Sequence, residues 1–279
     1  MPTAGLSLFG FYVPDVAAQY LTNVCHTADT SPEALNTAWL AAQERLGAPQ
    51  VKAGAPATMP LPAACQPYIA KLFAHPLMAR FQADFGVCEV KLVEIRPILS
   101  IQPHVEREQC AGSHALEGAT TQQLLERCLP LEGAPGQVKW EQERTGRGLL
   151  IRHPDFNLQT FGGAGVNTPE GALVAGPIIG VGAPWTQAME MDGRMHLRNG
   201  YHRAVGLMEA GHTHMPCLTF KGHRSQLGVE PAFSAEVMQG NNPPTVGHFD
   251  SNKATEVQLR KGTKVIAINW TEFLVLEQD

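Results

Sequence analysis

Charged residues are scarce in this chain, and basic residues do not dominate those present. Of its 279 residues, 17% are charged, and 21 Lys and Arg against 26 Asp and Glu give a formal net charge of −5. A phosphate backbone attracts proteins with an excess of basic residues, so this balance argues against nucleic acid as a partner. The 44% of hydrophobic residues is instead typical of a globular protein with a buried core, and disorder is excluded as the main description.

Long apolar runs are also missing. The most apolar stretch, 171–185, is interrupted by Gly and Pro and is shorter than the roughly 20 residues of a membrane helix. The first basic residue of the chain is Arg45. The apolar opening MPTAGLSLFGFYV therefore lacks the positive charge with which a secretory signal begins. We therefore expect a cytoplasmic protein with no membrane partner.

Closely spaced cysteine pairs are absent as well. No C-x-x-C occurs, which fits reduced thiols in a cytosol better than a disulfide framework or a zinc ribbon. We expect most of the cysteines to be small core residues. The six are Cys25, Cys65, Cys88, Cys110, Cys128 and Cys217.

The first 85 residues are predicted to be a helical N-terminal segment. Ser31 is an N-cap, Pro32 takes the first helical position, and Gly47 ends the helix. A Pro, Gly and Ala-rich connector over 48–63 precedes a second helical stretch over 68–85, interrupted at Pro76.

Residues 86–279 are predicted to form a second, mixed α/β domain with an insertion around 111–185. Alternation and turn residues indicate strands over 87–97, 137–144, 149–161 and 215–220, with helices over 120–128 and 201–210. Asp192-Gly193 predicts a hairpin between 186–191 and 194–198. A final hairpin is expected between 256–260 and 264–269, and 162–185 is expected to be weakly structured.

The segment RNGYHRAVGLMEAGHTHMPCLTF carries the strongest functional signal. A strand, a Gly turn and a helix that starts with His202 and Arg203 form a competent anion site. The unpaired N–H groups and the dipole of a helix start favour negative charge, and the two side chains add donors. Basic residues at this end oppose the dipole, so a bound anion or a nearby carboxylate should offset them. The plainer alternative is that Arg203 pairs with a structural Glu while His202 only packs.

This segment resembles the signature turn of the ParB N-terminal domain and sulfiredoxin superfamily. Asn199-Gly200-Tyr201-His202-Arg203, the helix, Gly211 and Met215-Pro216 match its Gly, two variable residues, Arg, helix, Gly and Val-Pro strand start. Upstream, 93–103 is similar to the opening strand and loop of that family. The resemblance implies a ParB/sulfiredoxin-like domain with a small mixed sheet and a nucleotide-phosphate pocket at the start of the 201–210 helix.

Members of this superfamily bind ATP or CTP, so the resemblance implies ATP or CTP with Mg²⁺ as cofactor and a small-molecule acceptor. Nucleotide binding with ATP-dependent phosphoryl transfer or hydrolysis is the predicted function. The predicted cofactor-binding residues are Asn199, Gly200, Tyr201, His202 and Arg203. The predicted catalytic residues are His202 and one of Glu94, Glu106 and Glu108, acting as base or metal ligand.

The chain departs from the family pattern at two positions. Tyr201 stands where sulfiredoxin has its reactive Cys, so reduction of sulfinic acids is not expected. Tyr201 and His202 replace the Glu and Arg of the ParB pattern, and no helix-turn-helix pattern follows. The alternative functions are a non-catalytic regulatory or binding protein of the same fold and a ParB-type DNA-associated protein.

A cluster of potential zinc ligands gives a competing hypothesis. Imidazole and thiolate suit zinc, and His212 and His214 would share one face of an extended segment. No helical H-x-x-x-H pair occurs, however, and loop histidines beside a strand are the favoured interpretation. The ligands in question are His196, His202, His212, His214, Cys217 and His223.

Overall fold

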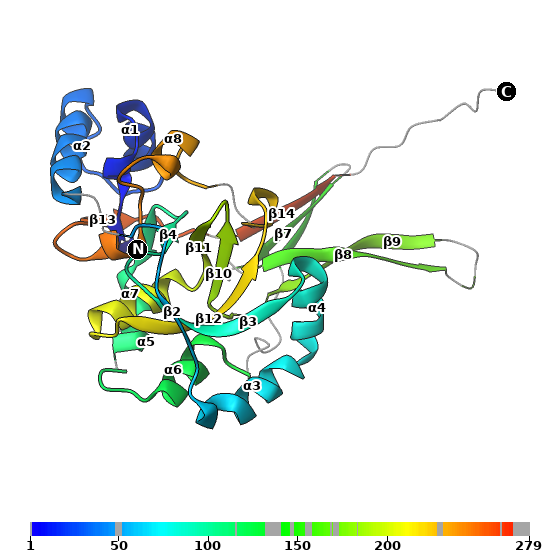
Figure 1. Cartoon of the computed structure of the whole chain (residues 1–279). Helices are drawn as coiled ribbons and strands as arrows, with labels where there is room; N and C mark the ends of the chain where they lie inside the picture. Colours follow the sequence, from blue (N-terminus) through cyan, green and yellow to red (C-terminus); the bar gives the residue numbers. More distant parts are fainter. Residues whose placement is uncertain are drawn as a thin grey trace. The chain divides into compact units, whose positions relative to one another are not determined.

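The structure is a computed structural model, and it shows a mixed α/β fold as expected (Figure 1). It describes residues 2–47, 52–114, 116–131, 141–145, 148–153, 158–167, 169, 173–182, 184–227, 231–262 and 264–269.

Contacts between residues divide the chain into two compact units. Unit 1 comprises Met1–Leu131 and Pro184–Lys261, and unit 2 comprises Glu132–Ala183 and Gly262–Asp279. The segment predicted to be a separate helical N-terminal part is thus integrated into unit 1. The segment that interrupts unit 1, 132–183, is shorter than the expected insertion around 111–185.

A six-stranded sheet forms the centre of unit 1. Its strand order is β2-β3-β12-β10-β11-β4, in which β12 runs parallel to β10 and antiparallel to β3, and β11 runs parallel to β4. The hairpin predicted at Asp192-Gly193 is confirmed, because β10 and β11 pair directly around it. The strands are β2 (Thr58–Pro60), β3 (Cys88–Glu94), β4 (Leu99–Ser100), β10 (Gln187–Met191), β11 (Arg194–Asn199) and β12 (His214–Lys221).

A second sheet corrects the prediction of a wholly helical N-terminal segment. The strand β1 (Thr3–Ser7) lies between β13 (Thr255–Leu259) and β5 (His104–Glu106), antiparallel to both. Residues 3–7 form a strand because two distant segments supply hydrogen-bond partners on both of its edges. Short-range sequence patterns do not contain that information.

The helices predicted over 31–47, 68–85, 120–128 and 201–210 are present, whereas the helices at 107–114 and 235–239 were not predicted. Ser31 caps its helix by accepting from Ala34 N, and Thr120 forms a capping box with Gln123. The α-helices are α1 (Pro14–Asn23), α2 (Pro32–Leu46), α3 (Gln66–Phe73), α4 (Pro76–Phe85), α5 (Arg107–His114), α6 (Thr121–Cys128), α7 (Tyr201–Glu209) and α8 (Ala235–Gln239). The 3₁₀ turns are η1 (Phe9–Phe11), η2 (Ala63–Cys65), η3 (Arg224–Leu227) and η4 (Val246–Phe249).

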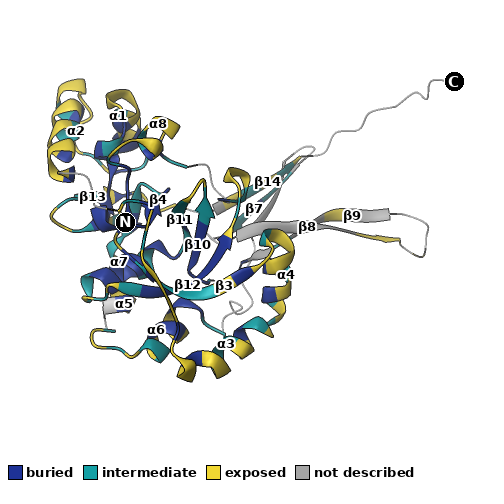
Figure 2. Ribbon diagram, viewed as in Figure 1, coloured by how far each residue is buried: buried dark blue, intermediate teal, exposed yellow. Residues whose placement is uncertain are grey.

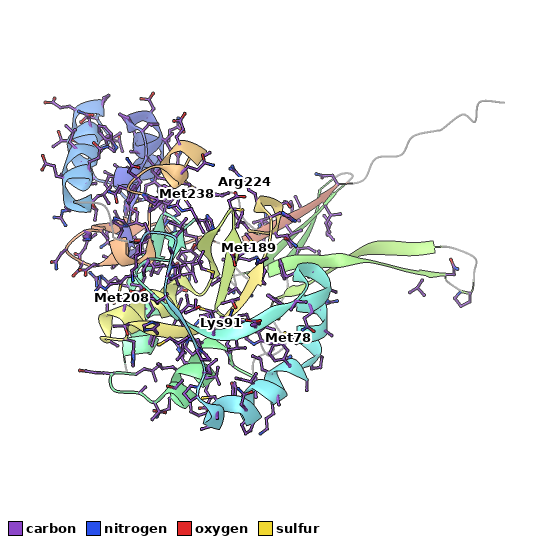
Figure 3. All side chains as sticks on the ribbon, in the orientation of Figure 1. Met78, Lys91, Met189, Met208, Arg224 and Met238 are labelled. Carbon is purple, nitrogen blue, oxygen red and sulfur yellow. The ribbon has the colours of Figure 1, made fainter. Side chains whose placement is uncertain are left out.

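The core of unit 1 lies between the central sheet and its helices, where α7 and β12 are buried along most of their length (Figure 2). All six cysteines are buried and free, which confirms the expectation that they pack as core residues. Trp185 is 1% exposed and contributes to the same core. The buried methionines Met78, Met189 and Met208 come from α4, β10 and α7 (Figure 3).

Unit 2 contains two antiparallel arrangements of strands. The first is a three-stranded sheet in the order β14-β7-β6, and the second is the pair β8-β9. The strands are β6 (Glu141–Thr145), β7 (Gly148–His153), β8 (Leu158–Asn167), β9 (Leu173–Val181) and β14 (Lys264–Asn269).

Two predictions about these strands were wrong. Much of the Gly-rich stretch 162–185 is not weakly structured, because it completes β8 and forms β9, and the two strands pair with each other. The expected hairpin between 256–260 and 264–269 does not form either, since β13 pairs with β1 and β14 pairs with β7. In both cases the pairing of the backbone overrides the local turn signal.

Candidate anion site at the start of helix α7

A tight glycine turn connects β11 to α7. Gly200 is the N-cap residue and has φ +100°, a left-handed conformation that favours glycine. A Cβ atom at this position would lie 2.5 Å from Cγ2 of Thr186. Both the backbone conformation and the close approach therefore require glycine here.

The N-terminus of α7 has no side-chain cap. Gly200 offers no side chain to accept from the N–H groups of the first turn, and this turn contains no acidic residue. Among the described residues, no side chain caps the first-turn N–H groups, and the helix dipole is positive at this end, which is the arrangement that favours an anion.

Tyr201 has a structural role in this turn. Its side chain is 2% exposed, and its hydroxyl donates to the carbonyl of Leu197 and accepts from Ile101 N at 2.9 Å. Burial raises the pKa of Tyr201, so the hydroxyl stays protonated. Tyr201 therefore fixes the loop after β4 to the start of α7.

His202 stands out because no hydrogen bond joins its imidazole to another residue that the structure describes. The ring is half-buried in the first turn of α7. Burial lowers its pKa to about 4, and the positive charges of His104 and Arg203 act in the same direction. At neutral pH His202 is an uncharged ring whose hydrogen-bonding capacity is unused within the described structure.

His104 is a neighbour of His202 that the sequence analysis did not single out. It opens β5, directly after the Gln102-Pro103 loop, and its Nδ1 lies 3.0 Å from the hydroxyl of Tyr20. Burial lowers the pKa of His104 to about 4. The available signal was its position next to the loop in the family-like segment.

Arg203 binds carbonyl groups at the end of α6. Its Nη1 donates to the carbonyl oxygens of Cys128 at 3.0 Å and of Arg127 at 3.4 Å. Helix ends leave such carbonyls without intrahelical partners, and they carry the negative end of the dipole. The charge of Arg203 is therefore offset by α6, a partner different from both the anion and the carboxylate considered from the sequence. Direct contact between Arg203 and a phosphate stays a prediction.

The three candidate carboxylates occupy different places in unit 1. Glu94 ends β3 opposite His214, which follows α7 at its far end, and it accepts from Ala57 N at 3.0 Å. Glu106 lies two residues after His104 on β5, and Glu108 is exposed in the first turn of α5. Of the three, Glu106 is nearest along the chain to the histidine that neighbours His202.

The potential zinc ligands do not gather into a metal site. Within the described part of the chain, no group of three or more His, Cys, Asp or Glu residues could hold a metal ion. His212 Nε2 lies 2.6 Å from the carbonyl oxygen of Leu116, and His196 lies on β11 with Nδ1 3.1 Å from the carbonyl oxygen of Arg194. Cys217 is buried, whereas His223 is exposed.

Comparisons of this chain with protein-family models, with curated proteins and with solved structures found no match. Across the described helices, none combines the length and apolar character needed to cross a bilayer.

Proposed function

We propose that this chain binds a nucleotide and holds its phosphate groups at the start of α7. The observation that carries the proposal is the imidazole of His202, which has no hydrogen bond to a described residue and lies in the first turn of a helix without a side-chain cap among the described residues. A phosphate oxygen would accept from the first-turn N–H groups and from His202. The resemblance of Asn199–Arg203 to the ParB and sulfiredoxin turn supports the same ligand, within a ParB/sulfiredoxin-like domain.

The roles proposed for the turn residues differ. Gly200 forms the left-handed turn into the helix, Tyr201 positions that turn, and His202 contacts the phosphate. Arg203 anchors the helix and adds positive charge near the site. Mg²⁺ would arrive with the nucleotide, since the described residues offer no metal-binding group of their own.

ATP-dependent phosphoryl transfer or hydrolysis is the proposed reaction, with Glu106 as the base. Its place on β5, the strand that also carries His104, favours it over Glu94 at the far end of α7. The dispersed carboxylates also favour a second candidate function, a non-catalytic protein that binds the nucleotide as a signal.

Calorimetric titration with ATP, CTP and inorganic phosphate, each with Mg²⁺, tests the binding proposal. We expect one nucleotide to bind and His202→Ala to weaken it about tenfold, the loss typical of a charge-assisted hydrogen bond. His26→Ala, which changes an exposed histidine far along the sequence, is the matched control and should bind normally. Absence of binding at millimolar concentration would overturn the proposal.

The pH dependence of binding gives a second readout. A bound anion favours the protonated form of His202, so the complex takes up a proton as the pH falls. Affinity should therefore rise between pH 7 and pH 5.5 in the wild type and rise less in His202→Ala.

A turnover assay separates the two candidate functions. Release of ADP or phosphate that Glu106→Gln abolishes would identify an enzyme, whereas tight binding without turnover would identify the non-catalytic protein.

A further inference from the structure

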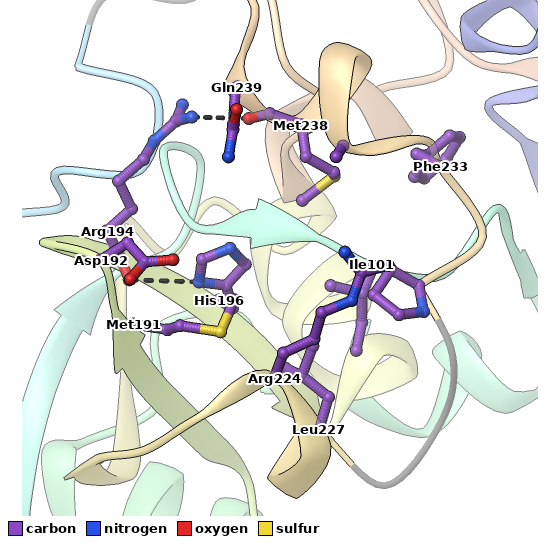
Figure 4. A pocket seen from close by; sticks show the side chains of 12 residues that line it. Ile101, Met191, Asp192, Arg194, His196, Arg224, Leu227, Phe233, Met238 and Gln239 are labelled. Carbon is purple, nitrogen blue, oxygen red and sulfur yellow. Dashed lines mark hydrogen bonds between the residues drawn. The ribbon is translucent and has the colours of Figure 1, made fainter.

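A cavity of about 110 Å³ lies within unit 1, between the β10–β11 hairpin, η3 and the segment 231–239 (Figure 4). Asp192, Ala235 and Gln239 line it and are exposed, so they mark its opening to solvent. Apolar concavities with a few polar groups are typical of small-molecule sites. The buried apolar part of the lining consists of Ile101, Leu227, Phe233 and Met238.

His196 supplies one buried polar group to this cavity. The residue is 5% exposed, and its Nδ1 lies 3.1 Å from the carbonyl oxygen of Arg194. A carbonyl oxygen only accepts, so Nδ1 carries the proton of the neutral ring and Nε2 carries a lone pair. Nε2 faces the side of the cavity where Met238 and Gln239 lie (Figure 4).

The lone pair of His196 is available to a ligand. Burial lowers the pKa of this imidazole, against the smaller opposing effect of the carbonyl groups of Arg194 and Met189, so the ring is neutral at pH 7. No N–H or O–H group of a described residue donates to Nε2. A ligand that fills the cavity displaces water from this nitrogen, and it avoids leaving the acceptor unpaired only if it brings a donor.

The charges at the cavity favour a ligand without charge. Both Nη atoms of Arg194 already donate to carbonyl oxygens, those of Met238 at 2.6 Å and Ala53 at 3.3 Å. Asp192, in the turn of the same hairpin, carries the opposite charge, and Arg224 has an interaction partner of its own. The positive charges are thus engaged or offset, and an uncharged ligand loses less hydration on entering than an ion does.

The size and the lining of the cavity favour a single aromatic ring. An apolar cavity of about 150 Å³ in another protein accommodates benzene, so about 110 Å³ admits no more than one ring, with its edge at the opening. The ring of Phe233 and the thioethers of Met191 and Met238 make favourable contacts with aromatic rings. We propose that this cavity binds a small uncharged phenol, whose hydroxyl donates to Nε2 of His196 and whose ring packs against Phe233 and Met238.

This cavity is separate from the nucleotide site proposed at α7. The structure describes all of Asn199–Arg203, and none of these turn residues lines the cavity. His202→Ala should therefore weaken nucleotide binding and leave phenol binding unchanged, so the two proposals succeed or fail separately.

Phenol is the probe, and toluene, in which a methyl group replaces the hydroxyl, is its matched control. Both are titrated into the full chain at pH 7 and followed by ligand-detected NMR. We expect phenol to bind with a Kd of about 1 mM, an ordinary affinity for a ligand of this size. Absence of phenol binding at about 10 mM would overturn the site. Cyclohexanol carries the same hydroxyl on a thicker ring and should bind more weakly, so equal affinity would overturn the choice of a phenol.

His196→Phe tests the hydrogen bond. Phenylalanine keeps an aromatic ring but offers no acceptor, so the hydroxyl of bound phenol would be buried without a partner. We expect phenol to bind at least about tenfold more weakly and toluene to bind no more weakly than to the wild type. An equal change for the two probes would overturn the assignment of the hydroxyl to His196.

A measurement on the wild type keeps the proposal testable if His196→Phe does not fold. A hydrogen bond from phenol moves the NMR resonance of an unprotonated imidazole nitrogen toward the value of a protonated one. The Nε2 resonance of His196 should therefore shift with phenol and stay in place with toluene. An unchanged resonance at saturating phenol would overturn the proposal.

Ala235→Leu locates the bound probe. Ala235 is exposed at the opening, so a leucine there narrows the cavity without disturbing the core and should weaken the binding of both phenol and toluene. Ala41→Leu, at an exposed position of α2, is the control and should bind both probes as the wild type does. Unchanged phenol affinity in Ala235→Leu would place the probe elsewhere and overturn the proposal.

Discussion

At the scale of single residues, Gly200 determines whether β11 can pass into α7. Its φ of +100° costs a residue with a Cβ about 1–2 kcal/mol, and the close approach to Thr186 adds to that cost. The family-like turn therefore depends on glycine for a physical reason that applies whatever the ligand.

Gly200→Ala should lower the free energy of unfolding by more than Gly211→Ala does. Gly211 has φ +87° but nothing within 4 Å of an added Cβ, so it isolates the cost of the backbone conformation. Urea unfolding followed by circular dichroism measures both variants. The double variant Gly200→Ala, Thr186→Ser should recover part of the loss, because Cγ2 of Thr186 is then absent. Equal losses at the two glycines would contradict this account.

Residue-scale prediction from the sequence succeeded where the cause is local and failed where it is tertiary. The need for a turn at Gly200 follows from the neighbouring strand and helix signals. The partners of Arg203 are carbonyl groups 75 and 76 residues earlier in the chain, and backbone carbonyls leave no trace in a sequence pattern. The contact between His104 and Tyr20 could not be predicted from the sequence for the same reason, because the two residues are far apart in the chain.

At the scale of elements, the end of α6 is fastened to several other segments. Thr186 N donates to the carbonyl of Cys128 at 2.9 Å, and Arg203 binds the same oxygen. Tyr68 donates to the carbonyl of Leu129 at 2.9 Å, and Trp185 Nε1 donates to that of Pro130 at 3.0 Å. Side chains from three distant segments thus satisfy the unpaired carbonyls of this helix end.

Arg203→Ala should therefore destabilise the chain itself, by about 2 kcal/mol, the usual worth of hydrogen bonds from a charged donor. His202→Ala should change stability much less, because no hydrogen bond to a described residue is lost. Thermal and urea unfolding of the two variants compare them directly. Full stability in Arg203→Ala would mean that its bonds to α6 contribute nothing, and would return Arg203 to the role of a phosphate ligand alone.

The elements that the sequence predicted best carry their signals within themselves. The Ser31 cap, the Gly47 stop and the Asp192-Gly193 turn each act over a few residues. The helix α2 and the β10–β11 hairpin that they predict are both present. The strands β1, β9 and β14 depend on partners far along the chain, so their existence or pairing was missed. Local chemistry fixes helix ends and tight turns, whereas sheets depend on contacts between distant residues.

At the scale of the whole molecule, buried neutral histidines couple stability to pH. Burial lowers the pKa values of His104, His202 and His248 to about 4, against 6.5 in an unfolded chain. Between these values the unfolded state binds more protons than the folded state, so stability falls as the pH falls. The contribution is fully present above pH 6.5 and is lost progressively toward pH 4.

Chemical unfolding at pH 7 and pH 4.5 should show this loss, on the order of 2 kcal/mol for each histidine with some water access. His202→Gln should lose less stability on acidification than the wild type, since one of the three bases is gone. His26→Gln alters an exposed ring and should follow the wild type. Identical pH profiles for His202→Gln and the wild type would contradict the depressed pKa of His202.

Unit 1 is interrupted by residues 132–183. Trp185 Nε1 binds the carbonyl of Pro130, so the chain leaves unit 1 after residue 131 and returns at 184 at neighbouring points. Insertions whose ends meet in this way are removable without straining the parent fold. A chain in which a short Gly-Ser linker replaces 132–183, and which stops at Lys261, should therefore fold as unit 1.

Fluorescence offers a direct measurement on this shortened chain. The excision removes Trp140 and Trp270 and leaves Trp39 and Trp185, of which Trp185 is 1% exposed. Native-like blue-shifted emission and a cooperative unfolding transition are expected, because the hydrogen bonds that hold Trp185 and the end of α6 all lie within unit 1. Red-shifted emission without a cooperative transition would instead show that unit 1 needs unit 2 to fold. The proposed nucleotide site would then depend on the whole chain, although the residues that form it belong to unit 1.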